Sequence, residues 1–229
     1  YVTALMLSKA GARVAIGARR TDRLKKLENE ISQNGGEVIS QKLDVTKNDD
    51  CKSLVDATIK KWDSVDILVN NAGLMPLSFV KNLKIDEWDR MIDVNIKGVL
   101  YCTGAVIPHM MEKKSGHIIN ISSVAGRVVF PSGSVYCATK HAVTAFSEGL
   151  RQEFSTRSNI RVTCSEPGVV ATELTSTITD ESLQSFVENS KKMESLHAED
   201  IANAILFAVD SPSHVNVNEV LIRPTKQER

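Results

Sequence analysis

Tyr136 and Lys140 are the two residues whose types and spacing point most clearly to chemistry. They stand four residues apart, and in a helix this spacing places both side chains on one face. A phenol can transfer a proton, but its ordinary pKa of about 10 is too high for efficient transfer at neutral pH. A neighbouring ammonium favours the phenolate. The pair therefore predicts a general acid/base with a lowered pKa, although the same spacing is also typical of a solvated helix face.

Ser123 and Asn95 extend this candidate site. Ser123 follows the apolar segment 117–122, HIINIS, and so stands at the carboxyl end of an expected strand, where ligands bind in open α/β sheets. A serine there can hold a substrate oxygen, or it can simply end the strand together with Ser122. Asn95 lies inside a helical pattern in which asparagine is a poor helix former. Its presence there indicates packing, function or local backbone capping.

Short apolar segments alternate with amphipathic segments along the whole chain, with no repeat and no linker. This alternation predicts an α/β fold, a doubly wound, Rossmann-like parallel sheet, and the apolar strands indicate helices on both faces in three layers. We expect a single domain over residues 1–229. The expected strands are 13–18, 37–43, 65–70, 117–122, 160–165 and 217–222, and the expected helices are 1–10, 21–34, 47–62, 86–112, 134–155 and 198–210.

The first of these helices, residues 1–10, ends at Gly11, which is a suitable cap. In a doubly wound fold such a helix follows a first strand and a glycine-rich turn that binds phosphate. Neither is present in the sequence, and we expect both to lie ahead of Tyr1. The alternative is a variant without the turn, in which the absent central strand would leave backbone groups unpaired.

Composition narrows the function classes. The chain has 28 basic and 28 acidic residues and 42% hydrophobic residues, so no charge excess favours nucleic acid or an anionic membrane. No long apolar run or signal-peptide pattern is present, and we expect a soluble, cytoplasmic protein. Four dispersed cysteines and five scattered histidines predict neither a disulfide framework nor a metal site; we expect reduced, mostly buried thiols.

Five motifs, in their order and spacing, resemble the short-chain dehydrogenase/reductases, over residues 1 to about 224. The resemblance implies a tetrad in which Tyr136 exchanges a proton with substrate and Ser123 hydrogen-bonds its oxygen, while Lys140 contacts the nicotinamide ribose and lowers the tyrosine pKa and Asn95 holds a relay water. It also implies a homodimer or homotetramer built through helices 86–112 and 134–155. The motifs are Asn70-Asn71-Ala72-Gly73, Asn95, Ser123, Tyr136 with Lys140, and Pro167-Gly168.

Charge at the end of strand 13–18 indicates the cofactor. An acidic residue there suits NAD, and arginine suits the 2'-phosphate of NADP. The chain has Arg19 and Arg20, with no acid until Asp22, which predicts NADP(H), although a solvated turn would also use paired arginines. Asp44 could contact adenine or cap the following helix. By resemblance, the remaining cofactor contacts are Asp44, Val45, Asn71, Ala72, Gly73, Tyr136, Lys140, Pro167, Gly168, Val170 and Thr172.

Substrate identity is the least defined feature. The expected pocket walls, residues 74–76, 127–130 and the loop after Thr172, are mostly apolar. Arg127 could meet a substrate carboxylate or lie at the surface. Residues 219–225 resemble the ending of bacterial-type members that act on 3-hydroxy acids or serine-like alcohols, and a broad aldehyde or ketone reductase fits equally well.

We therefore expect an NADP-dependent oxidoreductase that interconverts a small secondary alcohol and its carbonyl. One alternative is a catalytically silent, cofactor-binding regulatory protein of the same fold, whose mark would be a broken tetrad. All four members are present here. A nucleic-acid-binding or scaffold protein is a further alternative, but the sequence shows no basic face to favour it.

Overall fold

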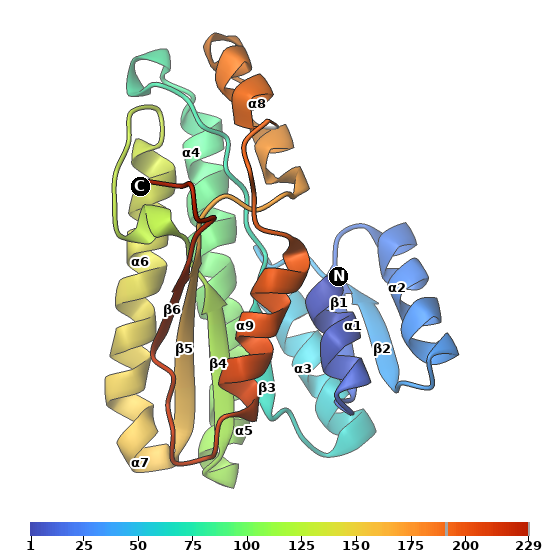
Figure 1. Ribbon diagram of the computed structural model, residues 1–229. Helices are drawn as coiled ribbons and strands as arrows, with labels where there is room; N and C mark the ends of the chain where they lie inside the picture. The colour runs from blue at the N-terminus through green and yellow to red at the C-terminus, as the bar shows by residue number, and fades with distance from the viewer. Residues whose placement is uncertain (191, 229) are drawn as a thin grey trace.

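Parallel β-strands form the centre of the protein, and each lies within two residues of the range that the sequence predicts. The computed structural model describes residues 1–190 and 192–228. Within them, six strands pair in parallel, as the Rossmann-like prediction requires (Figure 1). The strands are β1 Val14–Ala18, β2 Val38–Lys42, β3 Ile67–Asn70, β4 Gly116–Ile121, β5 Ile160–Pro167 and β6 Glu219–Ile222.

The strands divide into two sheets instead of one continuous sheet. β1 pairs with β2, and the other four follow the order β3-β4-β5-β6. Among the described residues, no strand pairs with the second edge of β1 or with the second edge of β3. The Rossmann-like class is confirmed, but the sheet is interrupted because no described segment supplies the backbone hydrogen bonds between these two edges.

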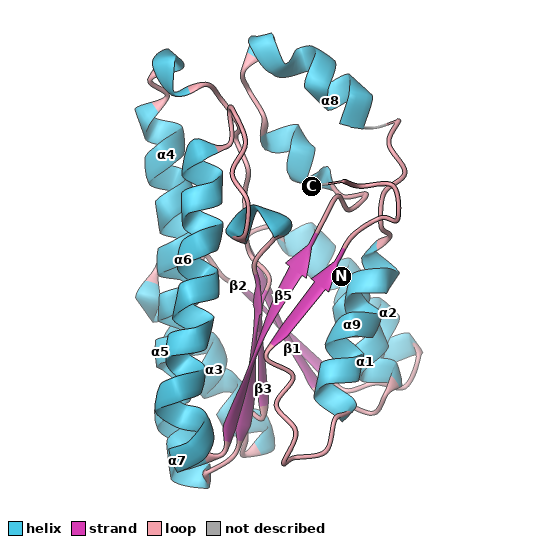
Figure 2. Ribbon diagram, turned by 60° about the vertical axis from the view of Figure 1, so that its left-hand side comes forward, coloured by secondary structure: helices cyan, strands magenta, loops and turns pink. Residues whose placement is uncertain are grey.

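Helices cover both faces of the larger sheet. Figure 2 shows α4, α5 and α6 on one side of β3 and β5, and α1 and α9 on the other, which gives the three expected layers. Helix α1 packs against α9 and ends before Gly11, whose φ of 94° is the predicted left-handed cap. The helices are α1 Val2–Lys9, α2 Thr21–Gln33, α3 Asn48–Trp62, α4 Ile85–Ile92, α5 Gly98–Lys113, α6 Ser134–Leu150, α7 Thr156–Ser158, α8 Gln184–Ser190 and α9 Ala198–Asp210.

The two long helices expected from the sequence are both interrupted. A π-helical turn, Asp93–Lys97, separates α4 from α5, and a second one, Arg151–Ser155, follows α6. Such turns insert one wider loop of backbone into a helix and frequently occur at functional sites. Helix α8 was not expected, because its seven residues are too few for a clear periodic pattern.

The core of the larger sheet is apolar, and it encloses a short chain of hydrogen-bonded polar side chains. Val106, Ile118 and Ile160 are fully buried between the sheet and α5. Beside them the Asn70 amide donates to Asn120 Oδ1 at 2.8 Å, and the buried Asn120 amide donates to a serine hydroxyl on α6. Buried amides of this kind need such partners, so they fix the strands relative to one another.

All four cysteines are free, and three of them are buried. Although they are dispersed in the sequence, the sulfurs of Cys51 on α3 and Cys102 on α5 lie 3.4 Å apart. In the part of the chain that the structure describes, no group of three potential metal-ligating side chains gathers. Nor does any described helix combine the length and the apolar character that crossing a membrane requires.

Two glycines of α5 give a test of this packing. A Cβ on Gly98 would lie 2.7 Å from Val45 Cγ2, whereas a Cβ on Gly104 would meet nothing within 4 Å. We expect Gly98→Ala to lower the free energy of unfolding by about 1–3 kcal/mol because of overpacking. The matched Gly104→Ala variant should raise it by up to about 1 kcal/mol. Urea unfolding measures both, and equal effects of the two variants would contradict the packing.

Candidate active site

Helix α6 carries Tyr136 and Lys140 on one buried face, as their spacing predicts. Tyr136 is 5% exposed and Lys140 is 6% exposed. The Lys140 ammonium lies 5.8 Å from the centre of the Tyr136 ring and donates a hydrogen bond to the Ile121 carbonyl at 2.9 Å. The alternative of a solvated helix face is therefore wrong for this pair.

Burial dominates the electrostatics of the pair. It raises the pKa of Tyr136 to about 12, and a hydrogen bond with Ser123 offsets this only in part. It also lowers the pKa of Lys140 to about 8. The expected lowering of the phenol pKa by the ammonium is thus not found, because desolvation disfavours both charged forms. At neutral pH, Tyr136 is a protonated phenol.

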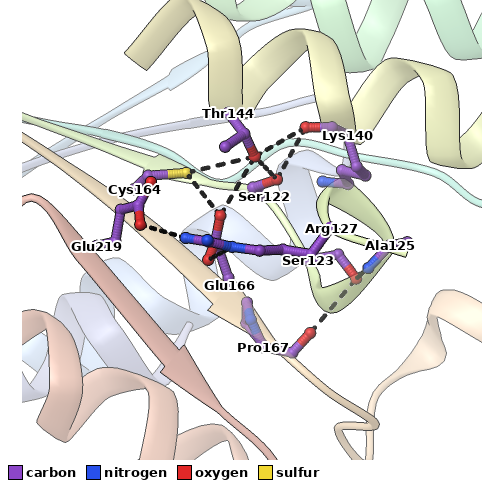
Figure 3. Close-up of polar contacts among 10 residues, drawn as sticks. All are labelled: Ser122, Ser123, Ala125, Arg127, Lys140, Thr144, Cys164, Glu166, Pro167 and Glu219. Carbon is purple, nitrogen blue, oxygen red and sulfur yellow. Dashed lines mark hydrogen bonds and ion pairs between the residues drawn. The ribbon is translucent and has the colours of Figure 1, made fainter. Parts of the chain in front are cut away.

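Ser123 lies where the sequence predicts, just beyond the carboxyl end of β4. It caps the 3-10 turn Val124–Gly126: its Oγ accepts from the Ala125 amide at 3.1 Å (Figure 3). The same hydroxyl donates to the Pro167 carbonyl at the end of β5, at 3.3 Å. Ser123 is therefore more than a strand end, because its side chain joins two segments.

Asn95 is 1% exposed and lies in the π-helical turn between α4 and α5. Its amide group bonds the Leu74 backbone in both directions, each at 2.9 Å, and donates to Thr139 Oγ1 at 3.1 Å. The Thr139 hydroxyl in turn donates to the Tyr136 carbonyl at 2.8 Å. Asn95 therefore connects the turn after β3 with the helix that carries Tyr136.

The turn Asn71-Ala72-Gly73 after β3 is exposed beside these side chains. A Cβ on Gly73 would lie 3.5 Å from Asn95 Oδ1 and 3.8 Å from Lys140 Nζ. The absence of a side chain at Gly73 thus leaves its backbone open next to the buried ammonium, and a bound group can approach closely there.

Arg19 and Arg20 follow β1 and are both exposed. The Arg20 guanidinium donates to Glu173 at 2.9 Å, and Arg23 pairs with the same carboxylate at 2.8 Å. Hydrogen bonds from Arg23 and Arg20 lower the pKa of Glu173 to about 2. The end of β1 therefore already binds an anionic group, here one from the loop after β5.

Asp44 does not cap the following helix, since Lys47 is the N-cap of α3. Its carboxylate instead accepts from the amide and hydroxyl of Thr46, at 3.1 and 2.8 Å. Burial acts to raise the pKa of Asp44, but these hydrogen bonds and the charges of Arg19 and Lys47 outweigh it, so that the pKa is lowered. The neighbouring Val45 packs against Gly98 at the start of α5.

The segment after β5 adjoins Ser123 through Pro167. The Gly168 amide donates to the Ile222 carbonyl at 2.7 Å, and Val170 pairs with Leu196 in an isolated β-bridge. Thr172 caps the next 3-10 turn: its hydroxyl accepts from the Leu174 amide at 3.3 Å. The residues predicted to contact nicotinamide therefore lie in one loop beside the tetrad.

Apolar side chains from all three expected pocket walls surround Tyr136. Leu74 and Leu183 are buried in one cluster with it, and Met75, Phe130 and Ile178 pack against that cluster. The Asp180 carboxylate, which the sequence did not suggest, accepts from Ser78 at 2.6 Å and Asn82 at 2.7 Å. It therefore fastens the loop after β5 to the loop after β3.

Arg127 does not face this cluster with a free guanidinium. Its Nε donates to the fully buried Glu166 at 2.7 Å, and its Nη2 pairs with Glu219 (Figure 3). These two carboxylates hold the pKa of Arg127 above its ordinary value. A role for Arg127 as receptor of a substrate carboxylate is not supported. Glu166 and Thr139 are site neighbours that the sequence did not indicate, since neither belongs to a recognisable spacing.

Known proteins match most of this chain. The family model of the short chain dehydrogenases matches residues 1–183. An uncharacterized oxidoreductase of Staphylococcus saprophyticus is 48% identical over 226 residues, which are 98% of this chain and 91% of that protein.

Two solved structures are also similar. The closed form of serine dehydrogenase complexed with NADP+ is 33% identical with a TM-score of 0.91, over 99% of this chain and 91% of that one. An alcohol dehydrogenase from the archaeon Thermococcus sibiricus, complexed with 5-hydroxy-NADP, is 27% identical with a TM-score of 0.87, over 99% and 92% of the two chains.

The chain belongs to the short-chain dehydrogenase family. It is accordingly an oxidoreductase, and its expected tetrad lies on the elements described above.

The buried ammonium of Lys140 predicts a pH-dependent stability. Its pKa in the folded protein, about 8, lies below its ordinary value of 10.5. Between these values the unfolded chain holds a proton that the folded chain has lost, so raising the pH favours folding. The free energy of unfolding of the wild type should rise relative to Lys140→Met by about 2–3 kcal/mol from pH 7 to pH 10. Urea unfolding at a series of pH values measures both proteins, and a difference in the free energy of unfolding that does not change with pH would contradict this shift.

Proposed function

We propose that this protein is an NADP(H)-dependent oxidoreductase that interconverts a small secondary alcohol and its carbonyl, with Tyr136 as general acid/base. One observation carries the proposal. The Ser123 side chain lies near enough to the buried, protonated Tyr136 to lower its pKa, and Tyr136 shares a buried face of α6 with Lys140, next to the open backbone of Gly73. An acid, an oxygen-binding hydroxyl and a cation thus adjoin a place for a bound group.

The residues present fit the cofactor at both ends of the site. Arg20 already pairs with an anion, the Glu173 carboxylate, and guanidinium groups bind phosphate in the same way. At the other end, the exposed Asn71–Gly73 turn lies next to the Lys140 ammonium. Both solved relatives described above carry NADP or a derivative of it. When bound, NADP(H) supplies or accepts the hydride.

The chain's own side chains would move the proton. In carbonyl reduction, Tyr136, which is protonated at neutral pH, donates its proton to the substrate oxygen. Ser123 exchanges the Pro167 carbonyl for the substrate oxygen and donates a hydrogen bond to it. Lys140 stabilises the phenolate that forms, because opposite charges attract strongly in a buried site. Alcohol oxidation follows the same steps in reverse.

A small, largely apolar substrate fits the surroundings of Tyr136. Leu74, Met75 and Phe130 belong to or pack against the apolar cluster that contains Tyr136, and apolar walls of this kind favour a carbonyl compound with short apolar substituents. A 3-hydroxy acid is the narrower proposal. Its support is the similarity to a serine dehydrogenase, whose named substrate carries a 3-hydroxyl group.

We also propose that a further strand joins the unpaired edges of β1 and β3, and that a glycine-rich turn after it binds the pyrophosphate. The support is the interruption of the sheet at these two edges. Assembly into a homodimer or homotetramer is a related proposal. Ile92, Leu100 and Met111, which lie on α4 and α5, are 39%, 40% and 45% exposed and could form part of the contact.

Replacement of the phenol tests the catalytic role directly. Tyr136→Phe is expected to lower kcat/KM on the order of 10³-fold, because the proton donor is lost, while the Kd for NADPH changes less than about twofold. NADPH oxidation with a panel of ketones, aldehydes and 3-oxo acids measures the rate. Tyr101→Phe, on α5, is the matched control and should retain wild-type turnover. A Tyr136→Phe enzyme with near-normal turnover would exclude the proposed mechanism.

Replacement of one arginine tests the cofactor preference. Arg20→Gln is expected to raise the Kd for NADPH on the order of tenfold by removing a charge-assisted phosphate contact, and to leave the Kd for NADH unchanged. Arg23→Gln removes the other guanidinium that pairs with Glu173 and should change neither Kd appreciably. Fluorescence titration measures both. Equal weakening of NADPH and NADH by Arg20→Gln would argue against phosphate recognition.

A further inference from the structure

Glu166 is a fully buried carboxyl group, 0% exposed, that the proposed reaction does not use. It stands at the end of β5, directly before Pro167. A buried carboxylate is costly unless it is paired, and Arg127 provides the pair at 2.7 Å. Figure 3 shows the two side chains between β5 and the turn that follows β4.

We propose that Glu166 is a positioning residue that, through its ion pair with Arg127, fixes the hydroxyl of Ser123. The inference rests on the proposed function, because Ser123 is the residue expected to bind the substrate oxygen. Glu166 itself does not contact the reacting atoms in this assignment.

The first connection runs through Arg127. Ser123 directly precedes the 3-10 turn Val124–Gly126, and Arg127 directly follows it. The Arg127 amide donates to the Val124 carbonyl at 2.9 Å. The ion pair therefore attaches the far end of this turn to β5. Rotation of the turn would displace Ser123 and break the pair together.

The second connection runs through Pro167. The Ser123 hydroxyl is held from two sides, by the Ala125 amide of the turn and by the Pro167 carbonyl of the strand. Glu166 and Arg127 join these same two segments. The residues thus form a closed ring in which the ion pair sets the separation between the two groups that hold the Ser123 oxygen.

The third connection runs to α6. Thr144 Oγ1 lies 3.3 Å from Glu166 Oε1 and 3.1 Å from the Lys140 carbonyl. Because α6 also carries Tyr136, one carboxylate contacts the segments that hold the acid, the cation and the oxygen-binding hydroxyl. This convergence distinguishes Glu166 from an ion pair that only stabilises the fold.

A double-mutant cycle tests the assignment. Glu166→Gln keeps the shape and removes the charge, and we expect kcat for carbonyl reduction to fall on the order of 10- to 100-fold, as displacement of a reacting group by about 1 Å causes. The Kd for NADPH should stay within about twofold. If Glu166 acts through Ser123, adding Glu166→Gln to the Ser123→Ala variant should lower kcat further by less than about twofold.

Each outcome of the cycle decides one point. Losses that multiply in the double variant, or a Glu166→Gln enzyme with kcat within twofold of the wild type, would overturn the positioning role. If Ser123→Ala and Tyr136→Phe also retain their rates, the proposed function fails as well. If these two lose activity while Glu166→Gln does not, only the present inference fails.

Two controls keep the test independent of folding. Glu219 provides the other carboxylate paired with Arg127, and its side chain is 45% exposed. The Glu219→Gln variant should lower kcat less than twofold. Arg127→Met with Glu166→Met replaces the buried pair by apolar side chains, an exchange that folds tolerate well. This double variant should melt near the wild-type temperature yet show the same loss of kcat. A fully active, folded double variant would contradict the assignment.

A crystal structure of the Glu166→Gln variant tests the assignment without requiring a substrate. We expect the contact between Ser123 Oγ and the Pro167 carbonyl, 3.3 Å in the wild type, to be lost. Its retention at the same distance would overturn the assignment whatever the rate measurements show.

Discussion

The parallel pairing of β4 with β5 is the constraint on which the site depends. In this register Ile121 stands opposite Ser165, so the carboxyl ends of the two strands and the residues directly after them lie at the same edge of the sheet. Ser123 therefore meets Pro167, and Arg127 meets Glu166. A shift of one residue would turn every side chain of the strand to the opposite face. It would separate these pairs as well as the apolar core, so stability and site geometry share one cause.

Desolvation is the second constraint, and it acts on the two titrating groups in opposite directions. The pKa of Tyr136 rises and that of Lys140 falls, so both move toward their neutral forms. The site consequently stores neither a phenolate nor a strongly basic amine in the state described here. An anionic group beside Lys140 would favour the ammonium again, which ties the protonation of the pair to what the site binds.

Periodicity and helix geometry were sufficient to predict the strand positions and the shared buried face of Tyr136 and Lys140. The strands are continuous apolar runs bounded by turns, and Tyr136 and Lys140 lie on a regular helix, so their relation follows from helix geometry. The prediction of a lowered phenol pKa was wrong, because the spacing of the two residues indicates a neighbouring ammonium but does not show that both side chains are buried. The short helix α8 was missed because its seven residues are too few for a clear periodic pattern. Glu166 and Asp180 acquire their partners from distant parts of the chain.

The pairing of Glu173 with Arg20 and Arg23 connects two segments that lie 150 residues or more apart in sequence. Its carboxylate and an external anion at Arg20 compete for the same guanidinium group. By thermodynamic linkage, binding of an anion there destabilises the docked position of the loop after β5. The docked loop weakens the binding of the anion by the same free energy. The loop that borders Tyr136 therefore responds to occupancy at the end of β1, and the strength of this response falls as ionic strength rises.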